Sequence, residues 1–97
     1  MKAVYNDTVL AESDKTVYIE GNQYFPPESV NKEFFTLNDQ HTTCFWKGEA
    51  NYYDIEVAGQ TEKGAAWYYP SPPQSAIDQV KTDFTGYVAF YPSVAVG

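Results

Sequence analysis

The sequence predicts a single, compact, mostly β domain of antiparallel strands with one or two short helices. Three observations favour this fold class. Residues 51–57 alternate apolar and polar side chains with the period of two that is typical of a half-buried strand. Turn-forming residues recur at close spacing along the chain, as they do between short antiparallel strands. No linker, repeat or low-complexity segment interrupts the 97 residues, so we expect one domain over residues 1–97.

The first 25 residues predict two β-hairpins. Asn6 and Asp7 tolerate a positive φ and suit a two-residue turn, and Gly21-Asn22 is a second signal of this kind. Pro26-Pro27 should end the second hairpin because proline has no N–H to donate to a strand ladder. The strands expected here cover residues 3–5, 8–12, 16–20 and 23–25.

The rest of the chain predicts two short helices and the longer strands. Val30 and Phe34 are spaced i, i+4 after a proline, which indicates a helix over residues 28–37. Ser75 and Asp78 have the spacing of a capping box, which predicts a second helix from Ser75 to Val80. The remaining strands are expected over residues 51–57, 65–69 and 86–91, with an edge strand over residues 93–96 and a loop over residues 59–64.

The charge of the chain excludes several classes of partner. It carries six Lys, no Arg and thirteen Asp and Glu, for a net charge of −7. Nucleic acids and anionic lipids are bound mainly through Lys and Arg, so we expect neither as a partner. No apolar run is long enough to span a membrane, and acidic residues interrupt the first fifteen positions where a secretory signal would be apolar. We therefore expect a cytoplasmic protein.

The single cysteine, Cys44, allows no internal disulfide and no cysteine-rich zinc site. His41 lies three residues before it, but a metal site would need two more ligands. Residues three apart on an extended strand point to opposite faces, which also argues against a Cys–His nucleophilic pair. We expect no metal and no cofactor, and Cys44 as a small buried apolar side chain.

Lys47 is the most unusual charged residue, since it lies within the aromatic stretch Thr43–Tyr53. Three interpretations remain open for it: a cation–π contact with neighbouring rings, an anion-binding donor at the mouth of a pocket, or a side chain that extends to solvent. Glu20 and Glu49 are the candidate acids to face it. Residues 67–70 form a second aromatic cluster, which either lines a pocket or fills a thin core.

The chain resembles a known family in several motifs, which include Cys44-x-Trp46-Lys47-Gly48 and Ala66-Trp67-x-Tyr69-Pro70. It is similar to the small bacterial proteins of domain-of-unknown-function family 427, which also carry the label nucleotidyltransferase-like. The resemblance covers nearly the whole chain and implies a compact β fold akin to the Mss4-like, or β-tent, architecture. The family usually has proline after the motif cysteine, whereas this chain has Phe45, which changes the turn beside Lys47. The other quoted motifs are residues 20–22, 24–27, 29–31, 50–53 and 88–90.

Because aromatic and charged residues concentrate in the same motifs, we predict a ligand-binding β module with an aromatic pocket around Trp46, Lys47 and Trp67. One alternative is a nucleotidyltransferase-like or other small enzyme that uses Lys47 and Glu20, although the chain shows no phosphate loop and no paired carboxylates for magnesium. Another is a structural module that associates with a second copy of itself. The predicted partner is a small molecule, and the candidate ligand-binding residues are Glu20, Trp46, Lys47, Tyr52, Trp67 and Tyr69.

Overall fold

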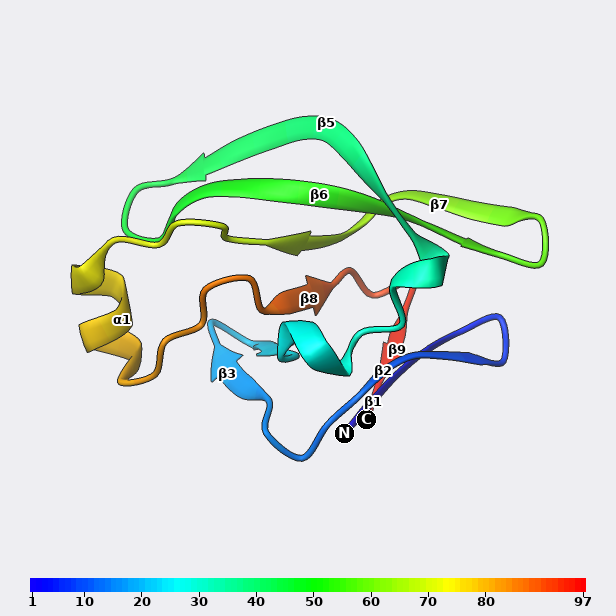
Figure 1. The fold of residues 1–97 in the computed structure, drawn as a ribbon, viewed down its shortest axis with the longest axis horizontal. Coiled ribbons are helices and arrows are strands. Elements are labelled where there is room, and N and C mark those ends of the chain that lie inside the picture. The colour runs from blue at the N-terminus through cyan, green and yellow to red at the C-terminus, as the bar shows by residue number, and fades with distance from the viewer.

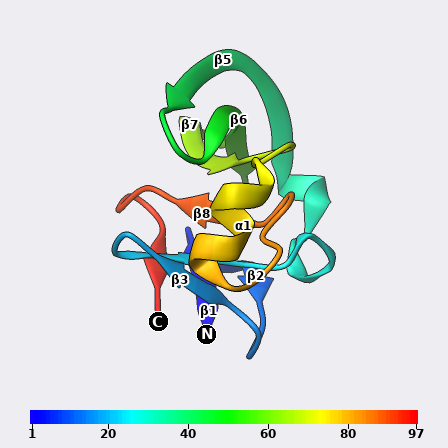
Figure 2. The ribbon, with the colours of Figure 1, turned by 90° about the vertical axis from the view of Figure 1, so that its left-hand side faces the viewer.

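A computed structural model describes residues 1–97 as a small β domain built from three antiparallel sheets, which confirms the predicted fold class. The four-stranded sheet has the order β5-β6-β7-β8 and lies above the other two, which have the orders β2-β1-β9 and β3-β4 (Figures 1 and 2). The chain termini lie side by side on β1 and β9. The strands are β1 Lys2–Tyr5, β2 Thr8–Glu12, β3 Val17–Ile19, β4 Asn22–Tyr24, β5 Phe35–Cys44, β6 Gly48–Val57, β7 Gln60–Tyr68, β8 Val88–Phe90 and β9 Ala95–Val96.

The helical content is one α-helix, α1 (Gln74–Val80), and two 3₁₀ turns, η1 (Pro27–Ser29) and η2 (Lys32–Phe34). No helix is long and apolar enough to cross a membrane. The resemblance to the Mss4-like or β-tent architecture stays a prediction.

Both N-terminal hairpins are present, with one shift in position. Asn6 and Asp7 have φ values of 51° and 58° and form the first turn as predicted. In the second hairpin the turn residues are Glu20 and Gly21, with φ values of 51° and 87°, and Asn22 already belongs to β4. The left-handed conformation places Glu20 at the tip of this turn.

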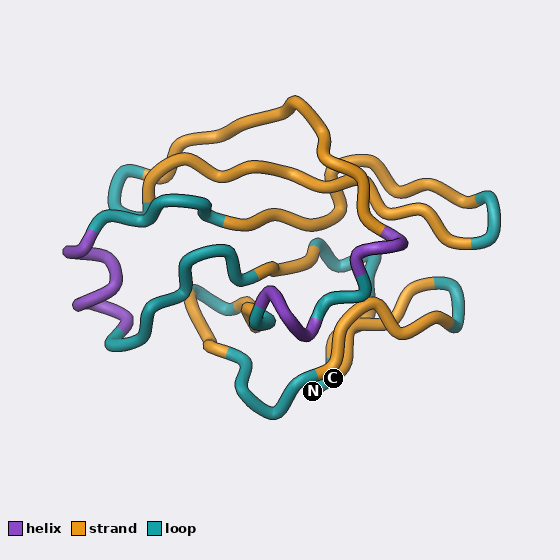
Figure 3. Tube along the Cα trace, in the orientation of Figure 1, coloured by secondary structure: helices purple, strands orange, loops and turns teal.

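The helix predicted over residues 28–37 is wrong. The segment forms the two separate 3₁₀ turns η1 and η2, and Phe35 already begins β5 (Figure 3). Val30, between the turns, is extended and forms an antiparallel bridge with Ala11 of β2. The backbone N–H of Asn31 donates to Leu10 O at 2.8 Å, and its side-chain amide donates to Val9 O at 2.9 Å. Pairing with β2 therefore overrides the helical spacing of the apolar residues.

Two further expectations need correction. The loop expected over residues 59–64 is a tight turn at Ala58-Gly59, after which β7 begins at Gln60. The helix expected from Ser75 is present as α1, but it begins one residue earlier, after Pro73, and has no side-chain cap. The side chain of Gln74 donates to Asp78 instead, at 3.0 Å.

The apolar side chains form two separate clusters on opposite faces of β6. Tyr53, Ile55 and Val57 face the first cluster, whereas Tyr52 belongs to the second, so the predicted alternation along this strand is confirmed. The first cluster joins β6 to β1, β2 and β8. The second cluster joins β6 to the β3–β4 hairpin and α1.

Asp54 fixes the bend of the large sheet. Its Oδ1 atom accepts hydrogen bonds from the Asn38 side chain of β5 at 2.7 Å and from the Gly64 N–H of β7 at 2.8 Å. Both strand pairings shift register here, between Asn38 and His41 and between Tyr53 and Ile55. These hydrogen bonds lower the pKa of Asp54 below its usual value of 3.8. One carboxylate thus holds three strands together at an irregularity next to Tyr53.

Candidate functional site

The structure brings three of the predicted site residues, Glu20, Trp46 and Tyr69, around Lys47. This residue lies in the three-residue loop between β5 and β6, which closes at Gly48 with a φ of 96°. The Lys47 Nζ atom forms an ion pair with Glu20, at the tip of the β3–β4 turn. It also lies 4.8 Å from the centre of the Trp46 ring and 5.4 Å from that of Tyr69. Lys47 therefore connects two hairpins that are far apart in the sequence.

The two partners of this ion pair have very different surroundings. Lys47 is only 5% exposed, whereas the Glu20 side chain is 55% exposed. Burial lowers the pKa of Lys47 below its usual value of 10.5. The pair is thus a buried amine with a solvent-facing acid. Any reactant would have to reach it from the side of Glu20.

Tyr24 connects the remaining predicted rings, although the sequence analysis did not select it. Its ring stacks on Tyr69 with the centres 6.4 Å apart, and its hydroxyl accepts a hydrogen bond from Trp67 Nε1 at 3.1 Å. Tyr52 bonds to the Thr42 hydroxyl at 2.8 Å. Burial raises the pKa of Tyr69 and of Tyr24. All these rings pack in the second apolar cluster.

We call Lys47, Glu20, Trp46 and Tyr69 the Lys47 cluster. No cavity lies between these residues. The structure contains three cavities, and none is lined by Trp46, Lys47 or Trp67. The aromatic pocket predicted around these three residues is therefore not supported. Trp46 and Trp67 both pack against the second apolar cluster, and Lys47 contacts the rings of Trp46 and Tyr69.

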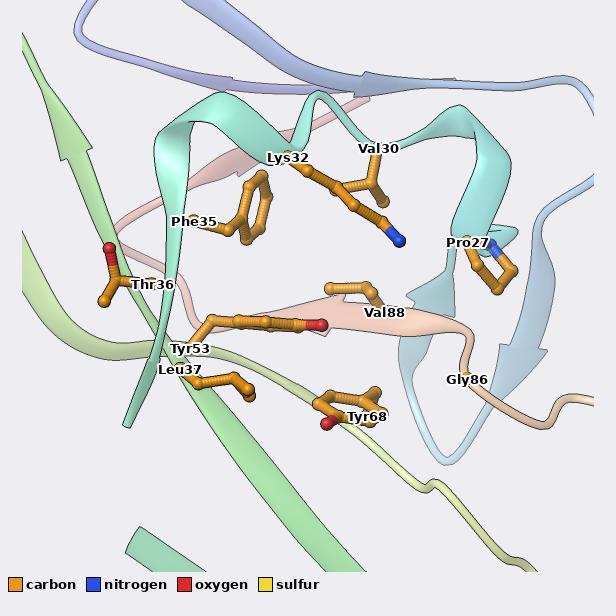
Figure 4. Close-up of a pocket in the computed structure, with 10 residues that line it drawn as sticks. All are labelled: Pro27, Val30, Lys32, Phe35, Thr36, Leu37, Tyr53, Tyr68, Gly86 and Val88. Carbon is orange, nitrogen blue, oxygen red and sulfur yellow. The ribbon is translucent and has the colours of Figure 1, made fainter. Parts of the chain in front are cut away.

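The largest cavity, about 550 Å³, lies on the other face of β6 and is drawn in Figure 4. We call it the main cavity. It opens between the η1–η2 segment, the start of β5 and the strands β6 to β8. Its lining comprises Pro27, Val30, Lys32, Phe35, Thr36, Leu37, Tyr53, Tyr68, Gly86 and Val88.

Aromatic rings form one wall of the main cavity. Tyr53 and Tyr68 are stacked with their centres 5.0 Å apart, and Phe35 meets Tyr53 edge-on at 5.4 Å. In Figure 4 the hydroxyl of Tyr53 points across the cavity toward Val88, and the Lys32 side chain extends over the opening from the opposite wall. Burial raises the pKa of Tyr53 above 10, so its hydroxyl stays protonated at neutral pH.

Two local features keep the main cavity open. The side-chain amide of Asn31 and the bridge at Val30 hold the η1–η2 segment on β2. Gly86 has a φ of 76° opposite Pro27, and a Cβ atom there would lie 3.3 Å from the proline Cγ. The sequence motifs contain Pro27, Val30, Tyr53 and Val88, but nothing in the residue pattern connects Lys32 with them.

The structure shows no group of three His, Cys, Asp or Glu side chains placed to hold a metal ion. His41 Nδ1 lies 2.7 Å from the Asn51 side-chain oxygen, on the exposed face of the sheet. Cys44 is half-buried against the second apolar cluster. These two residues thus have separate surroundings.

The fold is that of a small antiparallel β protein whose largest cavity measures about 550 Å³. Comparison with family models assigns the chain to a family. Residues 1–96 match the model NTP_transf_9, described as a domain of unknown function (DUF427), and the chain belongs to this family. The resemblance seen in the sequence motifs is thereby confirmed. A search of curated proteins gave no match.

Proposed function

We propose that this protein is a small-molecule-binding β module whose ligand occupies the main cavity. One observation carries the proposal: the cavity measures about 550 Å³ and has mostly apolar walls with few polar groups. Ligand pockets in proteins measure roughly 300–1,000 Å³ and have this type of lining. The module predicted from the sequence is thus retained, with the ligand on the opposite face of β6 from Lys47.

The Lys47 cluster has a different role in this proposal. Its ion pair joins the β3–β4 hairpin to the β5–β6 hairpin, and its rings fill the second apolar cluster. Both sets of side chains belong to β6, so the ring packing on the Tyr52 face also fixes the strand that carries Tyr53 on the cavity face.

A fragment screen followed by NMR tests the proposal. Binding should shift the amide resonances of Tyr53, Tyr68 and Val88 in ¹⁵N-labelled protein. Leu37→Trp should weaken it, since Leu37 lines the cavity but is 64% exposed, so that the larger ring can fill space without disturbing the core. Phe45→Trp is the matched control, because Phe45 is 97% exposed and lies outside the cavity. Shifts confined to other surfaces, or equal binding by both variants, would contradict the proposal.

A specific observation favours a second candidate function, a small enzyme that uses Lys47 and Glu20. A lysine with a lowered pKa beside a carboxylate can exchange a proton with a reacting group. Turnover of nucleotides or activated esters, measured with and without Mg²⁺, tests this candidate. Activity should disappear in both Lys47→Met and Glu20→Gln while the fold persists, and activity that survives in either variant would count against it.

A further inference from the structure

We infer that the main cavity selects a small monocarboxylate with a flat apolar body, such as an aromatic acid. This inference rests on the proposed function and adds the chemical class of the ligand. It draws on the charge at the opening, the chemistry of the walls and the position of one phenol.

The charge distribution favours an anion. The chain has thirteen acidic residues against six lysines, yet no acid lines the main cavity and one lysine does. Lys32 forms no ion pair, since the ion pairs of the structure join Lys2 to Glu12 and Lys47 to Glu20. Its ammonium is therefore free to bind a ligand at the opening. An unpaired cation beside an apolar space favours an anionic group over a neutral or cationic one.

A single negative charge fits this site better than a phosphate dianion. The cavity offers one ammonium and no guanidinium, whereas phosphate sites usually combine several donors with Arg or a helix N-terminus. The nearest helical elements, η1 and η2, are 3₁₀ turns of three residues each. A carboxylate needs fewer partners, and one ammonium with one hydroxyl can bind its two oxygens.

Tyr53 supplies this hydroxyl. Its hydroxyl interacts with that of Tyr68 beside it, and it points into the cavity from the wall opposite Lys32 (Figure 4). A protonated phenol donates to a carboxylate oxygen. Donors that converge from two walls define where the charged end of the ligand lies.

The walls define the other end. The rings of Tyr53, Tyr68 and Phe35 present aromatic surface, and Val30 and Val88 present aliphatic surface. Flat apolar groups pack well against such surfaces in offset or edge-on geometry. Aromatic acids combine this body with one carboxylate.

Three compounds with the same ring system test the inference: 2-naphthoate, 2-naphthylmethanol and 2-naphthylmethylammonium. We expect naphthoate to bind wild-type protein at least tenfold more tightly than the alcohol, and the ammonium compound to bind most weakly. Titrations followed by ¹⁵N NMR give the affinities and the place of binding together. Lys32→Met should reduce the preference for naphthoate to about twofold or less, whereas Lys15→Met, the exposed control outside the cavity, should keep it.

Tyr53→Phe separates the contribution of the hydroxyl group from that of the ring. It should weaken the binding of naphthoate several-fold and change the binding of the alcohol less, because the ring and its packing remain. Equal binding of all three compounds at the cavity would refute the ligand class and leave the proposed function intact. Failure of all three to bind, while screened fragments bind in the cavity, would refute the ligand class alone. Failure of both the three compounds and the screened fragments to bind there would refute the proposed function as well. An unchanged preference in Lys32→Met would refute the role of Lys32.

Discussion

Removing the two partners of the Lys47–Glu20 pair one at a time should destabilise the protein unequally. The reason is the difference in burial, since Lys47 is 5% exposed and the Glu20 side chain is 55% exposed. Without Lys47, the Glu20 carboxylate turns to water at little cost. Without the Glu20 charge, the ammonium stays buried among rings and lacks its anionic partner.

The sizes of the effects follow from the same geometry. Lys47→Met keeps most of the buried apolar volume and loses a pair whose acid is solvated, so it should change the free energy of unfolding by less than about 1 kcal/mol. Lys47→Ala also removes three buried methylene groups and should cost about 2.4 kcal/mol, at about 0.8 kcal/mol each. Glu20→Gln should cost about 1–2 kcal/mol, because the amide oxygen remains as an uncharged acceptor.

Urea unfolding at pH 7 followed by circular dichroism measures these differences, with Lys15→Met as an exposed-lysine control. In a domain of this size 1 kcal/mol corresponds to roughly 4–8 °C in Tm, so calorimetry resolves the series as well. The expected order of loss is Lys47→Ala, then Glu20→Gln, then Lys47→Met. A larger loss for Lys47→Met than for Glu20→Gln would refute the reasoning, because it would mean that attraction outweighs the cost of burying the ammonium.

Four further predictions concern other parts of the molecule. Stability should fall above about pH 10. The raised pKa values of Tyr24 and Tyr69 keep both hydroxyls protonated in the folded state, whereas the same groups ionise in the unfolded chain. A melting temperature independent of pH from 9 to 11.5 would contradict this. Stability should also fall below about pH 4, as the lowered pKa of Asp54 is approached, and Asp54→Asn should flatten this loss while costing about 1 kcal/mol at pH 7 by urea unfolding. Gly86→Ala should cost about 1 kcal/mol through strain at positive φ and should weaken fragment binding measured by NMR. The free edge of β5 should permit weak association of two copies, which Thr43→Lys reduces; light scattering that shows wild-type monomer up to millimolar concentration would contradict it.

Local sequence rules predicted the elements whose stability is local. The turn at Asn6-Asp7 depends on residues that tolerate positive φ. The alternation along β6 follows from the two faces of this strand, since alternate side chains face different apolar clusters. Glu20 was one of two candidate acids for Lys47, but the residue pattern left open whether this lysine contacts rings, binds an anion or extends to solvent. Strand β5 was not predicted, since most of it is polar and exposed at the edge of the sheet, and β-propensity indicates a half-buried surface.

The incorrect helix and the unforeseen cavity have one cause. On the Tyr52 side of β6, the β3–β4 hairpin and α1 close over the rings, and Lys47 pairs with Glu20 at the tip of this hairpin. On the Tyr53 side, the covering segment is η1–η2, which long-range pairing of Val30 with β2 holds in two short turns. Two turns of three residues each cover less of the sheet than a helix of ten residues, so space remains between Lys32 and Tyr53. The same pairing that defeats the local helix signal thus creates the space in which we propose the ligand binds.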